Sequence, residues 1–181
     1  MADRFSSLSD ELAQWWREQP VFFVATAPMI ADGHVNLSPK GYDTLRVLGP
    51  NRVAYLDLTG SGVETIAHLR ENGRVTLMAC SFSTEPRISR IYGQGRVHPF
   101  GSPGFDELAP EFPDLPGRRA IIDVAVTRVT TSCGFSIPQM ELVGDRDRLI
   151  EWADKRGEQG IVDYWGSKNA TSVDGLPGIS S

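Results

Sequence analysis

The chain has 181 residues, of which 40% are hydrophobic and 23% charged, which is typical of one soluble globular domain. Its formal charge of −5 argues against a nucleic-acid or anionic-membrane surface, because such surfaces need clusters of basic side chains. The sequence has no apolar run of about 18 residues, and acidic residues stand where a secretory signal would be apolar, so we expect a cytoplasmic protein with no membrane span.

The cysteines and histidines are few and scattered, which predicts neither a disulfide framework nor a metal site. We expect Cys80 and Cys133 to be reduced, with Cys80 a small core side chain. His68 is expected on the exposed side of a helix, far in sequence from His34 and His98.

In chain order, the first element is an amphipathic helix over residues 7–18, which Pro20 terminates. Period-2 hydrophobicity and turn residues then predict strands over residues 21–27, 34–40, 45–48, 52–58, 74–80, 88–98 and 119–131. Alternation over residues 34–40 places Asn36 and Ser38 on one face, and Val35 and Leu37 on the other.

Helices are expected at three further places. One covers residues 63–72 and ends at Asn72-Gly73, where a left-handed residue is available. A proline-rich loop over 99–116 carries at most a short helix at 105–109, and two helices follow, one capped by Asp145 and one over 158–168. Six or seven strands with one helix inserted after the fourth predict a mainly β (α+β) antiparallel barrel with peripheral helices.

The turn between the strand at 52–58 and the following helix has the composition of an anion site. Gly60 and Gly62 allow a tight turn around Ser61, which is expected to cap the helix in a capping box with Glu64. Unpaired amides of the first helical turn can hold a phosphate. Nearby hydroxyl groups would help: those of Thr59, Ser61 and Thr65. The alternative is a capped turn that binds nothing, and Glu64 would repel an anion placed close to it.

Three basic residues are candidate partners for such a phosphate: Arg87 and Arg90 on one strand, and Lys40 at the end of another. The alternative is that they are solvated surface side chains. The sequence has no nucleophile-and-base spacing and no Walker-type loop, so no catalytic residue is assigned. The phosphate would then belong to a tightly held cofactor that supplies redox chemistry.

The ordered series NLSPKG, VAYLDLTGSGVETIAHLRENGRVTLM and EPRISRIYGQGRV resembles the flavin-binding split-barrel proteins related to pyridoxamine 5′-phosphate oxidase. The resemblance covers residues 20–98. It implies an antiparallel split β-barrel, a homodimer with flavin mononucleotide (FMN) at the subunit interface, and hydride transfer with a small-molecule substrate.

The resemblance also implies roles for particular residues. Gly60, Ser61, Gly62 and Thr65 would lie near the phosphate, with Lys40 approaching from the neighbouring strand. Asn36 and Ser38 would line the isoalloxazine ring, and Arg87 and Arg90 would contact cofactor or substrate.

One departure from the family pattern leaves the substrate open. Members that oxidise pyridoxamine phosphate carry an Arg-Lys pair directly after the turn serine, where this chain has Gly62-Val63. The organisation expected is a split-barrel domain over 1–132, with the first helix, and a helical extension over 133–181. Ser132, Cys133 and the polar residues 168–172 either cover the flavin or a partner subunit, or belong to a helical cap.

Three functions stay open at this point. The first is an FMN-dependent oxidoreductase acting on an unknown small molecule. The second is a module that holds flavin, deazaflavin or haem without turnover. The third is a dimeric scaffold that has lost its ligand, in which Asn36, Ser38 and Lys40 are incidental.

Overall fold

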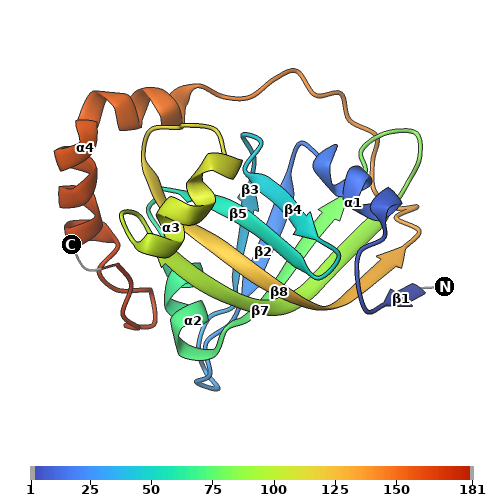
Figure 1. Ribbon diagram of the computed structural model, residues 1–181, viewed down its shortest axis with the longest axis horizontal. Helices are drawn as coiled ribbons and strands as arrows, with labels where there is room; N and C mark the ends of the chain where they lie inside the picture. Colours follow the sequence, from blue (N-terminus) through green and yellow to red (C-terminus); the bar gives the residue numbers. More distant parts are fainter. Residues whose placement is uncertain (1–2, 180–181) are drawn as a thin grey trace.

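The computed structural model describes residues 3–179, in which one antiparallel sheet forms the body of the molecule (Figure 1). The strands are β1 (Asp3–Phe5), β2 (Phe22–Thr26), β3 (Asn36–Lys40), β4 (Leu45–Gly49), β5 (Arg52–Leu58), β6 (Arg74–Cys80), β7 (Ile88–Pro99) and β8 (Arg118–Ser132). The helices are α1 (Asp10–Arg17), α2 (Glu64–Asn72), α3 (Pro103–Leu108) and α4 (Arg148–Lys168), with a 3₁₀ turn over Ala109–Glu111.

The strand order is β3-β2-β6-β7-β8-β5-β4, with β1 paired to β8, and all pairings are antiparallel. This arrangement confirms the split barrel with peripheral helices. The predicted strands are all present, and β1 adds an eighth. Its three residues are all exposed, so it has no alternating pattern by which the sequence could have revealed it.

The sheet buries two apolar clusters, one on each side of its central strands. The barrel interior holds the larger cluster, which includes Tyr55, Leu77, Ile91 and Ile122. The smaller one lies between α3 and the outer surface of β5 and β8. β5 is therefore buried over five consecutive residues instead of alternating, because it is covered on both faces.

Three helices begin at residues or with caps that differ from those expected from the sequence. α1 begins after Ser9, whose Oγ accepts the Leu12 N–H at 3.2 Å, and not at residue 7. α2 begins after Val63 and has no side-chain cap, so the capping box of Ser61 and Glu64 is wrong. α4 begins after Asp147, likewise without a side-chain cap, and not after Asp145.

Other predicted boundaries are confirmed. α2 ends at Gly73, which has the expected left-handed φ of 70°. Gly157 interrupts α4 with a non-helical conformation, dividing it into the two predicted helices. α4 lies at the opposite end of the molecule from α1, and the extended segment 133–147 runs across the molecule to reach it (Figure 1). None of the helices within residues 3–179 has both the length and the hydropathy needed to span a membrane.

Candidate functional site

The inward-facing side chains of β3 form a polar surface, here called the β3 polar face and made up of Asn36, Ser38 and Lys40. The Asn36 amide nitrogen donates to Thr65 Oγ1 at 2.9 Å and to Thr26 Oγ1 at 3.3 Å. The Ser38 hydroxyl donates to Asn36 Oδ1 at 3.1 Å. The predicted ring-binding pair therefore lies together with Thr65 from α2, in a network that fixes the orientation of the Asn36 side chain.

Lys40, at the end of this face, belongs to a buried charge cluster with Asp57 and Arg119. Lys40 Nζ lies 2.8 Å from Asp57 Oδ1, and two guanidinium nitrogens of Arg119 each lie 2.8 Å from Asp57 Oδ2. Burial alone would raise the pKa of the Asp57 carboxyl, but the two cationic neighbours outweigh it and the pKa is lowered. Asp57 is therefore ionised and holds both cations.

A buried hydroxyl next to this cluster has no hydrogen-bond partner. The Tyr55 side chain is fully buried, its ring lies 5.9 Å from Lys40 Nζ, and its Oη is unpartnered among the described residues. Burial raises the pKa of this phenol well above its usual value, so it is a neutral donor. An unpartnered donor beside the β3 polar face is a feature that a bound ligand or water would satisfy.

A hollow of about 520 Å³ opens beside Lys40, beneath the connecting segment 133–147. Its walls are mostly apolar and include Val21, Pro39, Phe82, Met140 and Leu142. Lys40 has three N–H donors and gives one to Asp57, so the others are available to a ligand in this hollow. Of the β3 polar face, Lys40 borders this space, which is large enough for a small molecule.

The carbonyl groups of the turn over residues 59–62 accept hydrogen bonds from side chains of distant elements. Arg119 Nη1 donates to the carbonyl oxygen of Gly62 at 2.8 Å, and Asn169 Nδ2 donates to that of Gly60 at 3.0 Å. Thr59 Oγ1 donates to Gly117 O and accepts the Trp165 indole N–H, both at 2.8 Å. Thr59 is therefore fully engaged in joining the turn to α4, and it has no proton left for a phosphate.

The predicted phosphate corner, residues 59–65, also holds a carboxylate of its own. The Glu64 side chain folds back over Gly62, where it would collide with any Cβ, and its Oε1 accepts the Val173 N–H at 3.3 Å. Asp57 carries one negative charge against the two positive charges of Lys40 and Arg119, so their buried cluster keeps one net positive charge. The contacts of Glu64 are instead with the backbone N–H of Val173. A phosphate placed over Gly62 would meet the Glu64 carboxylate at short range, so the corner in this arrangement does not fit a phosphate.

The corner is covered by the C-terminal segment, residues 169–179. Asp174 from this segment accepts the backbone N–H of His34 at 2.9 Å and lies 2.7 Å from His34 Nδ1. Arg70 of α2 donates to the carbonyl oxygen of Gly178. The segment therefore joins α2 to the loop before β3, across the entrance to the β3 polar face.

His68 is buried and not exposed as predicted. Its Nδ1 lies 3.0 Å from Thr26 Oγ1, and its Nε2 has no partner among the described residues. Burial lowers the pKa of the imidazole. Helical spacing alone places His68 on the exposed side, but α2 is packed on several sides, and both Thr65 and His68 on its polar positions are buried.

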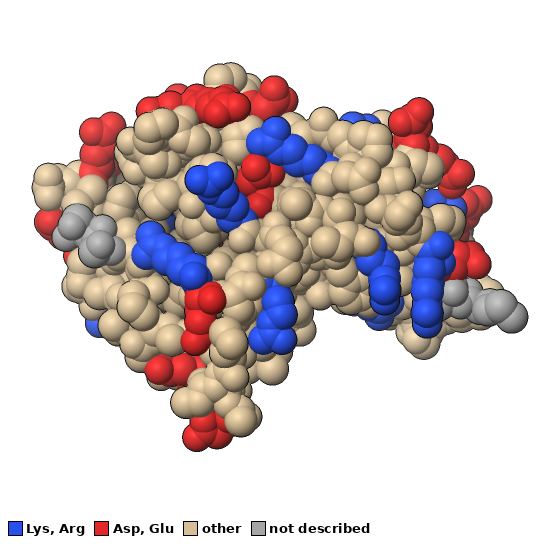
Figure 2. Space-filling model, turned by 60° about the horizontal axis from the view of Figure 1, so that its bottom comes forward, with Lys and Arg blue, Asp and Glu red and all other residues tan. Residues whose placement is uncertain are grey.

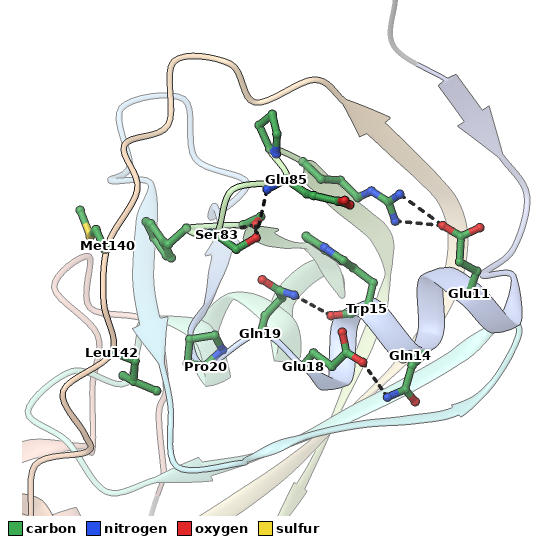
Figure 3. Close-up of a pocket in the computed structure, with 14 residues that line it drawn as sticks. Glu11, Gln14, Trp15, Glu18, Gln19, Pro20, Ser83, Glu85, Met140 and Leu142 are labelled. Atoms are coloured by element: carbon green, nitrogen blue, oxygen red, sulfur yellow. Dashed lines mark hydrogen bonds and ion pairs between the residues drawn. The ribbon is translucent and has the colours of Figure 1, made fainter.

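The two strand arginines lie away from the corner and apart from each other. Arg87 pairs with Glu11 at 3.2 Å and lies over the Trp15 ring, in a hollow of about 770 Å³ between α1 and residues 81–87 (Figure 3). Arg90 points to the outer surface of the sheet, paired in register with Met78 and Thr130. Figure 2 shows Lys and Arg side chains spread around a hollowed face of the molecule. The structure does not bring Arg87 or Arg90 to the β3 polar face.

Several residues of the site were missed from the sequence. Asp57 is a charged residue within the apolar run of β5, which was a usable signal for a buried pair, whereas Arg119 lies next to Arg118 at the start of β8 and gave no such signal. The His34–Asp174 contact joins residues 140 positions apart and has no local signal. Cys80 is buried and Cys133 exposed, both as free thiols. Within residues 3–179, no three His, Cys, Asp or Glu side chains are grouped as a metal would need.

The antiparallel split barrel, with polar side chains of β3 facing the start of α2, defines the structural class of the chain. Residues 8–133 match the family model described as pyridoxamine 5′-phosphate oxidase, so the chain belongs to that family. It is 41% identical over 196 residues to the pyridoxamine 5′-phosphate oxidase family protein ustO of Aspergillus flavus, covering 98% of this chain and 78% of the relative.

Solved structures support the fold. A putative pyridoxamine 5′-phosphate oxidase from Lactobacillus delbrueckii is similar with a TM-score of 0.53 and 21% identity, over 69% of this chain and 94% of that one. HupZ from Group A Streptococcus is similar with a TM-score of 0.52 and 19% identity, over 67% and 91%. At these identities the likeness establishes the split barrel and nothing more specific.

Proposed function

We propose that this protein is an FMN-dependent oxidoreductase that acts as a homodimer on a small molecule, with the flavin ring against the β3 polar face. The observation that carries the proposal is the network of Asn36, Ser38 and Thr65 beside the unpartnered Tyr55 hydroxyl. Membership of the pyridoxamine 5′-phosphate oxidase family supports a flavin as the ligand. A bound flavin would supply hydride transfer.

The chain's own residues would orient the ring and exclude water. Asn36 is fixed by three hydrogen bonds that use both of its N–H donors, so its Oδ1 would be a preorganised acceptor for an N–H of the ring. Lys40 keeps donors free toward the apolar hollow, where a substrate with an electron-rich edge would lie. The connecting segment 133–147 forms part of the wall of that hollow and limits access of water to it.

A homodimer accounts for an exposed apolar surface beside this site. The β2–β3 hairpin carries Met29, Ile30, Val35 and Leu37, all more than half exposed. Leu37 lies on the outer side of β3, directly behind the β3 polar face. Apolar side chains gathered in this way are typical of an interface, and a second subunit here would also shield a flavin from water.

The test begins with the absorption spectrum of the purified protein, followed by titration with FMN, deazaflavin and haem. We expect an oxidised-flavin spectrum, or uptake of FMN, and reduction of that flavin by a nicotinamide cofactor. Asn36→Leu should weaken flavin binding by about tenfold or more, the usual effect of losing a hydrogen-bonding partner at a buried polar site. Asn51→Ala, on an exposed turn on another part of the sheet, is the matched control.

The outcomes separate the three functions. Flavin that binds but is never reduced or reoxidised by a partner indicates a carrier or sensor. Binding of deazaflavin or haem in place of FMN moves the proposal to that ligand. If no ligand binds, or if Asn36→Leu binds flavin as tightly as the natural chain, the β3 polar face is not the flavin site.

A further inference from the structure

We propose that Glu64 and the C-terminal segment 169–179 form a built-in plug that fills the phosphate corner at the start of α2. This inference rests on the proposed function, because it states how a flavin would be held: by its ring, with little contribution from its phosphate while the plug is in place. The plug is an internal competitor for the anion, supplied by the chain itself.

The first support is the position of the Glu64 carboxylate. The first-turn amides of α2 lack intrahelical partners and carry the positive end of the helix dipole. The side chain at the first position of α2 turns back across Gly62, so its carboxylate lies at the turn that leads into the helix, although it accepts no capping hydrogen bond there. A carboxylate in that position provides the charge complement that a phosphate would otherwise supply.

The second support is the set of hydrogen bonds that hold the C-terminal segment over the corner. Val173 donates its N–H to Glu64, and Arg70 donates to the carbonyl oxygen of Gly178. Asn169 bonds the turn carbonyls from the same side, and Arg119 donates to Asn169 Oδ1 at 3.0 Å. The segment also closes on itself, since Thr171 and Pro177 form a bridge. It is therefore an ordered loop docked on α2.

The third support is the balance of charge around the corner. The single carboxylate of Asp57 faces two cations, Lys40 and Arg119, so that buried cluster keeps one net positive charge. Arg70 and Arg119 nevertheless direct their donors to carbonyl groups, those of Gly178 and Gly62. Asp174 adds a second carboxylate at the entrance, clamped on His34. A phosphate entering the closed corner would meet these two carboxylates, and Arg70 and Arg119 would have to release the carbonyl groups they hold before they could contact it, which is unfavourable.

The test compares FMN with riboflavin, which differ by the phosphate alone. Dissociation constants are measured by flavin fluorescence for the natural chain, for Glu64→Gln and for Asp174→Asn. For the natural chain we expect the two flavins to bind within about threefold of each other. Glu64→Gln should tighten FMN by about tenfold and leave riboflavin unchanged, because it removes a like charge from the phosphate site. Asp174→Asn should shift FMN in the same direction by a smaller factor.

Glu151→Gln is the matched control, since Glu151 is an exposed carboxylate in the first turn of α4 and takes no part in the contacts described for the C-terminal segment. It should change neither dissociation constant. A natural chain that binds FMN more than a hundredfold more tightly than riboflavin, with no gain from Glu64→Gln, overturns the plug.

A second measurement does not depend on flavin. Inorganic phosphate is titrated while the backbone amide resonances of Gly60, Ser61 and Gly62 are followed by NMR. We expect these resonances to stay in place in the natural chain and to shift in Glu64→Gln. Shifts of equal size in both proteins overturn the plug. If neither flavin binds any variant but phosphate moves the amides of Glu64→Gln alone, the plug stands and the proposed function fails.

Discussion

Arg119 and Asp57 form a buried two-point contact in which Nε and Nη2 of the guanidinium both lie 2.8 Å from the same carboxylate oxygen. They come from adjacent strands, β8 and β5, and their side chains are 5% and 1% exposed. The same guanidinium donates through Nη1 to the turn over residues 59–62 and to Asn169. Arg119 thus holds three parts of the site together: Asp57, which pairs with Lys40, the turn over residues 59–62, and the start of the C-terminal segment at Asn169.

Asp57→Asn tests the importance of this contact for stability. The substitution leaves two buried or half-buried cations without their counter-charge, which typically costs about 3 to 5 kcal/mol of unfolding free energy. The measurement is urea denaturation at neutral pH. Asp123→Asn is the control, because its partner Arg52 is 49% exposed and such surface pairs contribute about 1 kcal/mol or less. Equal losses in both variants would contradict the buried network.

The His34–Asp174 contact predicts a pH dependence for docking of the C-terminal segment. The hydrogen bond and the charge of Asp174 raise the pKa of His34, with a smaller contribution in the same direction from Asp32. Because the folded pKa lies above the unfolded value, the contact stabilises docking fully below the unfolded pKa and is lost as pH rises through the folded pKa.

The pKa of His34 can be followed by NMR titration of its imidazole protons. Asp174→Asn should return it toward the ordinary histidine value, since the principal cause of the shift is removed. Hydrogen exchange of the amides in residues 170–178 should be slower at pH 5.5 than at pH 8 after correction for intrinsic rates. A His34 pKa that is the same in both proteins would show that the contact between His34 and Asp174 is not formed in solution.

The fold was largely predictable because its strands are long, alternating and separated by clear turns. β7 alternates closely over residues 88–96, β8 alternates only in its middle because residues 119–122 are all buried, and the resemblance of residues 20–98 adds the split in the barrel. β1 was not predictable, since three exposed residues carry no pattern. The helix starts were shifted where the expected cap was engaged elsewhere, as at Glu64, whose side chain binds Val173, 109 residues away.

The parts of the candidate site that depend on local sequence were predictable, but the contacts between residues distant in sequence were not. Alternation placed Asn36 and Ser38 together on one face, and the structure adds Thr65 to them. The assignment of Ser61 as a cap failed because capping rules are local, while the turn is fixed by Arg119 and Asn169 from distant elements. Contacts of that kind depend on tertiary packing, which a single sequence does not display.

Gly73→Ala tests the left-handed end of α2. Gly73 has a φ of 70°, and a Cβ there would meet the side chain of Gln94, so both backbone strain and crowding oppose the substitution. We expect a loss of about 1 kcal/mol or more in thermal or urea unfolding. Gly49→Ala is the matched control, since a Cβ at Gly49 has no heavy atom within 4 Å and no positive φ is required. Identical stabilities of the two variants would contradict this account.

Leu37→Glu tests the proposed homodimer. Leu37 is 65% exposed on the outer side of β3, in line with Ala25 of the neighbouring strand, so a second subunit packed here would bury it. A charge buried at such an interface without a partner is costly, and we expect the variant to sediment as a monomer at concentrations where the natural chain is dimeric. Val143→Glu, at a fully exposed position of the connecting segment, should keep the natural association state. A monomeric natural chain, or a Leu37→Glu variant that still dimerises, would place the partner surface elsewhere. The β3 polar face would then need its cover from within the chain, which the C-terminal segment is positioned to give.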